Sequence, residues 1–132
     1  MAASANATRH GLTSAKLIAG DEKQEDFDSL LLDLQQSYKP ANPAEQMLVV
    51  EIAQTFWRLQ RARLVEAETF GMAWPAGQSV MSGFSFYQGL IYQVGRYMLS
   101  VERAWHRSIQ QLERMQAARA KQIESEPQIG FV

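Results

Sequence analysis

The second half of the chain carries a sustained three-four alternation of apolar residues. Its ten positions, of which only Ser108 is polar, are Phe84, Tyr87, Ile91, Val94, Met98, Val101, Trp105, Ser108, Leu112 and Met115. A repeat that persists over more than four heptads forms one narrow seam along a helix and is typical of coiled-coil-like packing. Because Gly89 and Gly95 weaken the first turns, the pattern predicts a long helix over residues 87–123.

Two further helices are expected before this one. Residues 21–38 carry apolar side chains at helical spacing and a cluster of acidic residues in the first turn, where negative charge complements the helix dipole. Pro40 ends this helix. Asn42 followed by Pro43 is an N-cap residue with proline at the first helical position, which predicts a second helix over residues 43–70.

The second helix has two apolar stripes. One stripe contains Val49, Ile52, Phe56 and Leu59, and the other contains Met47, Val50, Trp57 and Leu64. A helix that is apolar on two sides must be covered on two sides, so we expect it at the centre of the fold with the third helix on one face. The other face is covered either by the first helix or by a second copy of the protein.

Together these elements predict an all-α protein, a long antiparallel helical hairpin with a short acidic N-terminal helix and an irregular N-terminal arm. The expected organisation is an arm over residues 1–20, one helical domain over residues 21–123 and a flexible tail over residues 124–132. Turn signals at Trp74-Pro75, Ala76-Gly77 and Ser82-Gly83 predict a loop over residues 71–86.

Two surfaces are expected to make protein contacts. The loop over residues 71–86 is unusually apolar and either caps the hairpin or meets another protein. The seam of the third helix is the second surface, because that helix is longer than its neighbour and the overhang needs a partner, which favours a homo-oligomer. The interface candidates are Met72, Trp74, Met81, Phe84, Val94, Met98, Val101, Trp105, Leu112 and Met115.

The sequence contains few of the residue combinations that catalysis usually requires. The chain has no Cys, and its two histidines, His10 and His106, are far apart in the sequence, so no nucleophile-base pair is indicated. Glu102 lies four residues before His106, and we expect a surface ion pair there rather than a metal site. The acidic run and the glycines match no calcium loop, phosphate loop or dinucleotide fingerprint. We therefore expect no enzyme, no metal and no cofactor.

Charge is balanced overall but unevenly distributed. Thirteen Lys and Arg against fourteen Asp and Glu leave a formal charge of −1, which argues against binding of nucleic acid or membrane by bulk charge alone. Residues 96–121 carry a local +4 and residues 21–33 a local −5. The two regions either neutralise each other within one molecule or leave the basic one free for phosphates. The candidate phosphate-binding residues are Arg9, His10, Arg96, Arg103, Arg107, Arg114 and Lys121.

The sequence also leads to expectations about the partners of three arginines and about the location of the protein. A half-buried arginine needs a partner, so at least one of the arginines at 58, 61 and 63 is expected to pair with Glu51 or Glu102. The most apolar window contains two glutamines and an arginine, and the first twenty residues lack the continuous apolar core of a secretory signal. We therefore expect no contact with membranes and a cytoplasmic protein.

The opening segment suggests relatives. Asn6-Ala7-Thr8-Arg9-His10-Gly11-Leu12-Thr13-Ser14 resembles the N-A-x-[RK]-H-G-[LF]-x-S arm of many small helical bacterial and phage proteins, some of which resemble phage terminase small subunits. The looser similarity extends to Tyr38-Lys39-Pro40 through Glu45, to Trp57-Arg58-Leu59 and Glu66, and to Arg96-Tyr97 through Glu102-Arg103 and Leu112. The terminase resemblance implies a non-enzymatic, ring-forming DNA-recognition subunit whose hairpin drives oligomerisation. Such subunits usually begin with a helix-turn-helix, whereas this chain has an acidic helix there.

Two hypotheses about function follow. The first is a non-enzymatic, self-associating helical interaction or scaffold protein. The second is a nucleic-acid-associated accessory protein of a phage or mobile element, which binds through the arm and the basic side of the third helix.

Overall fold

The computed structural model describes residues 17–73 and 79–125, and of residues 72–73 and 80–87 it describes the backbone alone. Within these ranges the regular elements are three helices, α2 (Gln24–Tyr38), α3 (Pro43–Ala73) and α4 (Val80–Ser125). The predicted all-α class is therefore confirmed. Arg9 and His10, and nearly all of the tail expected over residues 124–132, lie outside the described residues.

The turn between α2 and α3 follows the local signals in the sequence. Lys39 ends α2 in the left-handed conformation, with φ of 49°, and its N–H donates to the carbonyl of Gln35 at 2.9 Å. Asn42 caps α3, because its Oδ1 accepts a hydrogen bond of 2.9 Å from the N–H of Glu45. Pro43 is the first helical residue of α3, as predicted.

The predicted loop over residues 71–86 is wrong, because both long helices run into it. Met72 lies in α3, and Met81 and Phe84 lie in α4, which begins at Val80. Trp74 lies outside the described residues. The reason is energetic, since a glycine within a helix costs only about 1 kcal/mol relative to alanine, and a long helix with a packed face tolerates that. α2 shows the opposite error, as it begins at Gln24 rather than at residue 21.

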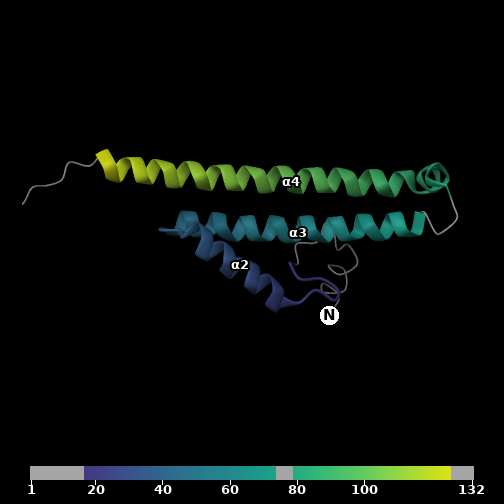
Figure 1. The fold of residues 1–132 in the computed structure, drawn as a ribbon, viewed down its shortest axis with the longest axis horizontal. Helices are drawn as coiled ribbons and strands as arrows, with labels where there is room; N and C mark the ends of the chain where they lie inside the picture. Colours follow the sequence, from purple (N-terminus) through teal and green to yellow (C-terminus); the bar gives the residue numbers. More distant parts are fainter. Residues whose placement is uncertain (1–16, 74–78, 126–132) are drawn as a thin grey trace, which may run out of the picture.

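The two long helices lie side by side and antiparallel (Figure 1). Glu45 at the start of α3 pairs with Arg119 near the end of α4. Halfway along, the rings of Phe56 and Trp105 have centroids 5.8 Å apart. With 31 residues in α3 and 46 in α4, their lengths are about 46 Å and about 69 Å, so α4 outruns its partner.

The heptad seam of α4 faces α3 within the same chain. Val94, Val101, Ser108 and Leu112 are buried. The other described seam residues, Ile91, Met98, Trp105 and Met115, are half-buried. The seam therefore supplies the core of the hairpin, and its members Val94, Val101 and Leu112 are covered by the chain itself. An interface to another molecule through the remaining seam residues stays a prediction.

α3 is the central helix, but its second apolar stripe is covered only in part, because Met47 and Leu64 are 72% and 58% exposed. Its neighbouring residues Phe56 and Trp57 serve different partners, since Phe56 contacts Trp105 of α4 and Trp57 meets the ring of Phe27 of α2 edge-on, with centroids 5.6 Å apart. The first helix therefore packs within its own chain. The buried cluster at the three-helix junction is formed by Leu48, Val49, Ile52 and Leu112, with Leu31, Leu34 and Tyr38 of α2 among the half-buried residues against it.

Replacing Leu112 tests this packing. Its side chain is 0% exposed, so Leu112→Ala should lower the free energy of unfolding by about 2–5 kcal/mol through lost burial and a cavity. The matched control is Leu99→Ala on the outer face of the same helix, where the side chain is 48% exposed and the loss should be much smaller. Urea unfolding followed by circular dichroism measures both, and equal losses would contradict the assigned orientation of α4.

Candidate functional site

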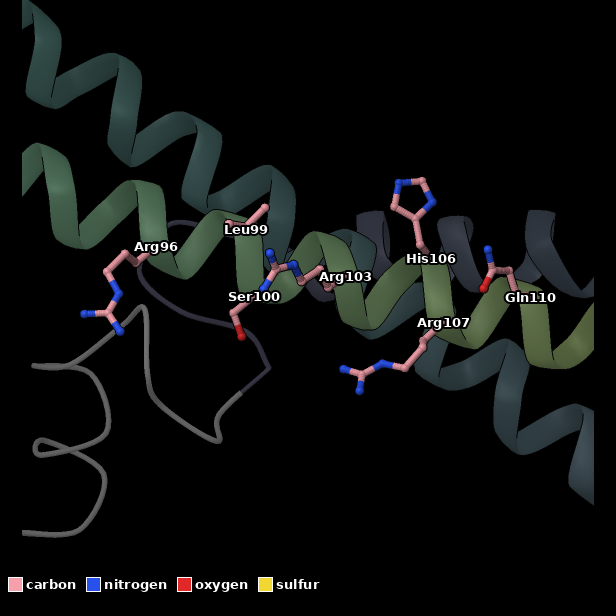
Figure 2. A pocket seen from close by; sticks show the side chains of 7 residues that line it. All are labelled: Arg96, Leu99, Ser100, Arg103, His106, Arg107 and Gln110. Atoms are coloured by element: carbon pink, nitrogen blue, oxygen red, sulfur yellow. The ribbon is translucent and has the colours of Figure 1, made fainter.

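The outer face of α4 carries the most distinctive polar surface of the described residues. Because the seam turns one side of α4 toward α3, the residues between the seam positions face outward. A shallow groove of about 700 Å³ lies on this face (Figure 2). Its lining residues, all exposed, are Arg96, Leu99, Ser100, Arg103, His106, Arg107 and Gln110, and we call it the α4 groove.

Three guanidinium groups dominate the electrostatics of the α4 groove. Figure 2 shows Arg96 and Arg107 reaching to the same side of α4, with Arg103 between them along the helix and His106 pointing elsewhere. The described lining of the groove contains no carboxylate. Among the described residues, the ion pairs are those of Arg61, His106 and Arg119. The three groove arginines make no ion pair with a described carboxylate, so their positive charge can act on a ligand.

The basic surface extends beyond the groove toward the end of α4. Arg114 and Lys121 are both exposed, and their positions in the heptad repeat place them on the outer side. We call Arg96, Arg103, Arg107, Arg114 and Lys121 the basic stripe. Arg119 does not belong to it, because its side chain turns back to Glu45 of α3. The structure therefore exposes all five candidates on the third helix and gathers Arg96, Arg103 and Arg107 in one groove, whereas Arg9 and His10 lie outside the described residues.

The acidic helix does not cover the basic stripe. α2 packs on α3, α4 packs on α3, and Figure 1 shows α3 lying between them. The acidic side chains Glu25, Asp26 and Asp28 of α2 are exposed. The sequence left open whether the acidic and basic regions neutralise each other within one molecule. The described helices do not adopt that arrangement.

Glu45 is the centre of a buried polar junction that sequence patterns do not reveal. Its side chain is 1% exposed, and its Oε2 accepts from Arg119 Nε at 2.9 Å and from Asn42 Nδ2 at 2.9 Å. Gln116 Nε2 donates to Glu45 Oε1 at 3.1 Å and to the carbonyl of Tyr38 at 2.7 Å. These bonds join the α2–α3 turn to α4 and fix the register of the hairpin.

The bonds to Arg119 set the charge state of Glu45. Together with the hydrogen bonds from Gln116 and from the N–H of Ala41, they lower the pKa of its carboxyl from 4.5 to about 2, although removal from water acts in the opposite direction. The same pairing raises the pKa of Arg119 above its usual value. Asn42 followed three residues later by Glu45 is the available sequence signal, because it matches a capping box, but nothing local identifies Arg119 as the partner.

A second ion pair links the segment before α2 to α3. Arg61 is buried and its Nη2 lies 2.7 Å from Glu22 Oε1, and it also donates to the carbonyl of Leu17. Burial raises the pKa of Glu22, but hydrogen bonds from Arg61 and from the N–H of Ala19 outweigh it, so the net pKa lies below 4.5. The prediction that an arginine of this helix needs a partner is right for Arg61, but that partner is not Glu51 or Glu102.

His106 behaves as the sequence predicts. Its Nε2 lies 3.7 Å from Glu102 Oε1, and both side chains are exposed, which matches the expected surface ion pair. In the described part of the chain, no cluster of three or more His, Asp or Glu side chains is arranged to hold a metal ion. The α4 groove is therefore a surface that offers positive charge and hydrogen-bond donors, with one weakly paired imidazole at its side.

Comparisons of the chain with protein-family models, with curated proteins and with solved structures found no match. Within the described residues, none of the helices combines the length and the apolar character needed to cross a membrane.

The pH dependence of stability tests the Glu45 junction. Because the folded pKa of about 2 lies below the unfolded value of 4.5, the ionised carboxylate stabilises the fold above pH 4.5, and this contribution is lost as the pH falls toward 2. Glu45→Gln should therefore lower the melting temperature at neutral pH, and its difference from the unmodified chain should shrink across that window. Glu113→Gln, at an exposed position of α4, is the control. A constant difference between Glu45→Gln and the unmodified chain would contradict the assignment.

Proposed function

We propose that the protein binds nucleic acid through the phosphate backbone, with the basic stripe of α4 as the contact surface. The observation that carries the proposal is the α4 groove, in which three exposed arginines lie together without a carboxylate in the described lining. Guanidinium groups are well suited to phosphate because they are planar and present paired N–H donors.

The arrangement of charge explains how a chain with a net charge of −1 can bind a polyanion. Each phosphate contact by Arg or Lys releases condensed counterions, so a local stripe gains binding free energy regardless of the total charge. Helix α2, which carries the acidic residues, lies across α3 from α4, and this distance weakens its repulsion of a ligand on α4. This function suits a non-enzymatic, cytoplasmic accessory protein of a phage or mobile element, in keeping with the resemblance of the opening segment.

Salt-dependent binding tests the proposal. Fluorescence anisotropy with labelled DNA at a series of salt concentrations should show affinity that falls steeply with salt, with a slope of log K against log salt of about −3 to −5 if all five stripe residues meet phosphates. Arg103→Glu should weaken binding and reduce the slope by about one. Arg63→Glu on α3 is exposed and changes the net charge equally, so it is the matched control.

Three outcomes would overturn the proposal. They are the absence of binding at low salt, an equal loss with Arg63→Glu and Arg103→Glu, and binding only to vesicles of anionic phospholipid. The vesicles are included because a lipid headgroup also presents phosphate to arginine.

A second candidate function is self-association through α3, and it rests on a different surface. The α3 groove, of about 780 Å³, is lined by Gln35, Pro43, Gln46, Met47, Val50, Glu51, Gln54, Thr55, Arg58 and Ala104. Met47 is 72% exposed there, which is unusual for a large apolar side chain. Glu51 and Arg58 lie seven residues apart on this face, so an antiparallel second copy related by a two-fold axis would set each Glu51 against the other copy's Arg58.

Light scattering over a range of protein concentrations tests the second candidate. A dimer should form as concentration rises, and Met47→Glu should shift the equilibrium toward monomer because it puts charge into the apolar contact. Gln111→Glu, at an exposed position of α4 that does not line this groove, adds the same charge and should have the smaller effect. A monomer at every concentration would eliminate this candidate.

A further inference from the structure

We infer that the α4 surface takes single-stranded nucleic acid, and that Tyr92 provides the platform on which a base stacks. The inference rests on the proposed function and specifies the class of ligand for the same site. Tyr92 is 64% exposed and lies one turn before Arg96 on the outer side of α4. The guanidinium carbon of Arg96 lies 5.7 Å from the centroid of the Tyr92 ring, so the aromatic ring and the first cation of the basic stripe form one unit.

Among the described residues, few side chains besides that of Arg96 surround Tyr92. On a helix, the neighbours of residue 92 are residues 88, 89, 95 and 96, and two of these four are Gly89 and Gly95. A hollow of about 480 Å³ lies here, lined by Gln88, Gly89, Ile91 and Tyr92. The ring therefore stands beside open space on the sides where other residues would place side chains.

Packing among the described residues does not require these two glycines. A Cβ added at Gly89 or Gly95 would meet no atom within 4 Å, so neither position is needed for close approach of another part of the described chain. Each glycine nevertheless weakens the helix relative to alanine. A flat ligand that binds beside Tyr92 would explain both glycines, because side chains at these two positions would fill the space that the ligand needs.

The shape of the surface favours a single strand over a duplex. From Tyr92 to Lys121 the outer side of α4 spans about 44 Å, and Figure 1 shows this helix running straight beside α3. A straight row of charges meets a rigid duplex only where the curved backbone touches it, whereas a flexible strand can follow the whole row. Positive charge along the strand combined with an aromatic platform for bases is the usual arrangement for binding single strands without sequence preference.

The test compares a single-stranded DNA oligonucleotide with a duplex of the same length at equal ionic strength. The single strand should bind more tightly to the unmodified chain. Tyr92→Ala should weaken single-strand binding about fivefold or more and change duplex binding little, and Tyr92→Phe should retain it because the ring remains. Because Tyr92 is exposed, its replacement should leave the fold intact, and thermal melts of each variant check this directly.

Gly95→Gln provides an independent arm of the test. The added side chain has free space at its Cβ, so it should raise the melting temperature by removing a helix-weakening glycine, and yet weaken single-strand binding by occupying the space beside the ring. If Gly95 has only a structural role, Gly95→Gln should stabilise the protein without weakening its binding of single-stranded DNA.

The outcomes separate this inference from the function on which it rests. If neither DNA form binds, the proposed function fails and the inference with it. If duplex binds as tightly as single strand, and Tyr92→Ala and Gly95→Gln leave binding unchanged while Arg103→Glu weakens it, the proposed function stands and the inference is overturned.

Discussion

The packing of the α4 seam into α3 is the interaction on which the rest of the molecule depends. Burial of residues such as Val94, Val101 and Leu112 orients α4 along its whole contact with α3. Once that side is fixed, the geometry of the helix decides which residues face outward, and the basic stripe follows without any contact of its own. The exposed arginines thus owe their common direction to apolar residues one or two positions away.

The polar junction around Glu45 adds what a hydrophobic seam lacks, a defined register. Apolar side chains in a heptad repeat can slide by one repeat at modest cost, whereas a buried carboxylate leaves its charge unpaired if it loses Arg119. The same carboxylate also bonds Asn42 at the start of α3. One side chain therefore ties the local signal that begins α3 to the long-range alignment of α3 with α4.

The sequence predicts the parts of this structure that depend on local signals and periodicity. The class, the cap at Asn42, the end of α2 and the inward face of α4 all follow from spacing and from the chemistry of helix ends. The start of α4 at Val80 was missed because glycines only weaken a helix and do not end it.

Long-range partners are the other part that the sequence does not predict. Arg61 needs an acidic partner, but the choice of Glu22 over nearer carboxylates depends on how the segment before α2 lies against α3. For the candidate site, the heptad pattern identifies the five basic residues of α4. The sequence pattern does not single out Tyr92, because an exposed aromatic ring becomes informative only when the space around it is known.

The position of α3 between an acidic and a basic helix gives the molecule two electrostatically opposite sides. Under the proposed function, a nucleic-acid strand lined with copies of this protein would present the acidic α2 of each copy to the solvent, so the coated strand would remain a polyanion. Further copies could still add by setting their basic sides against those acidic ones, but only through weak, exposed charge pairs that physiological salt screens. Such a coat would be one molecule thick and would repel neighbouring coated strands.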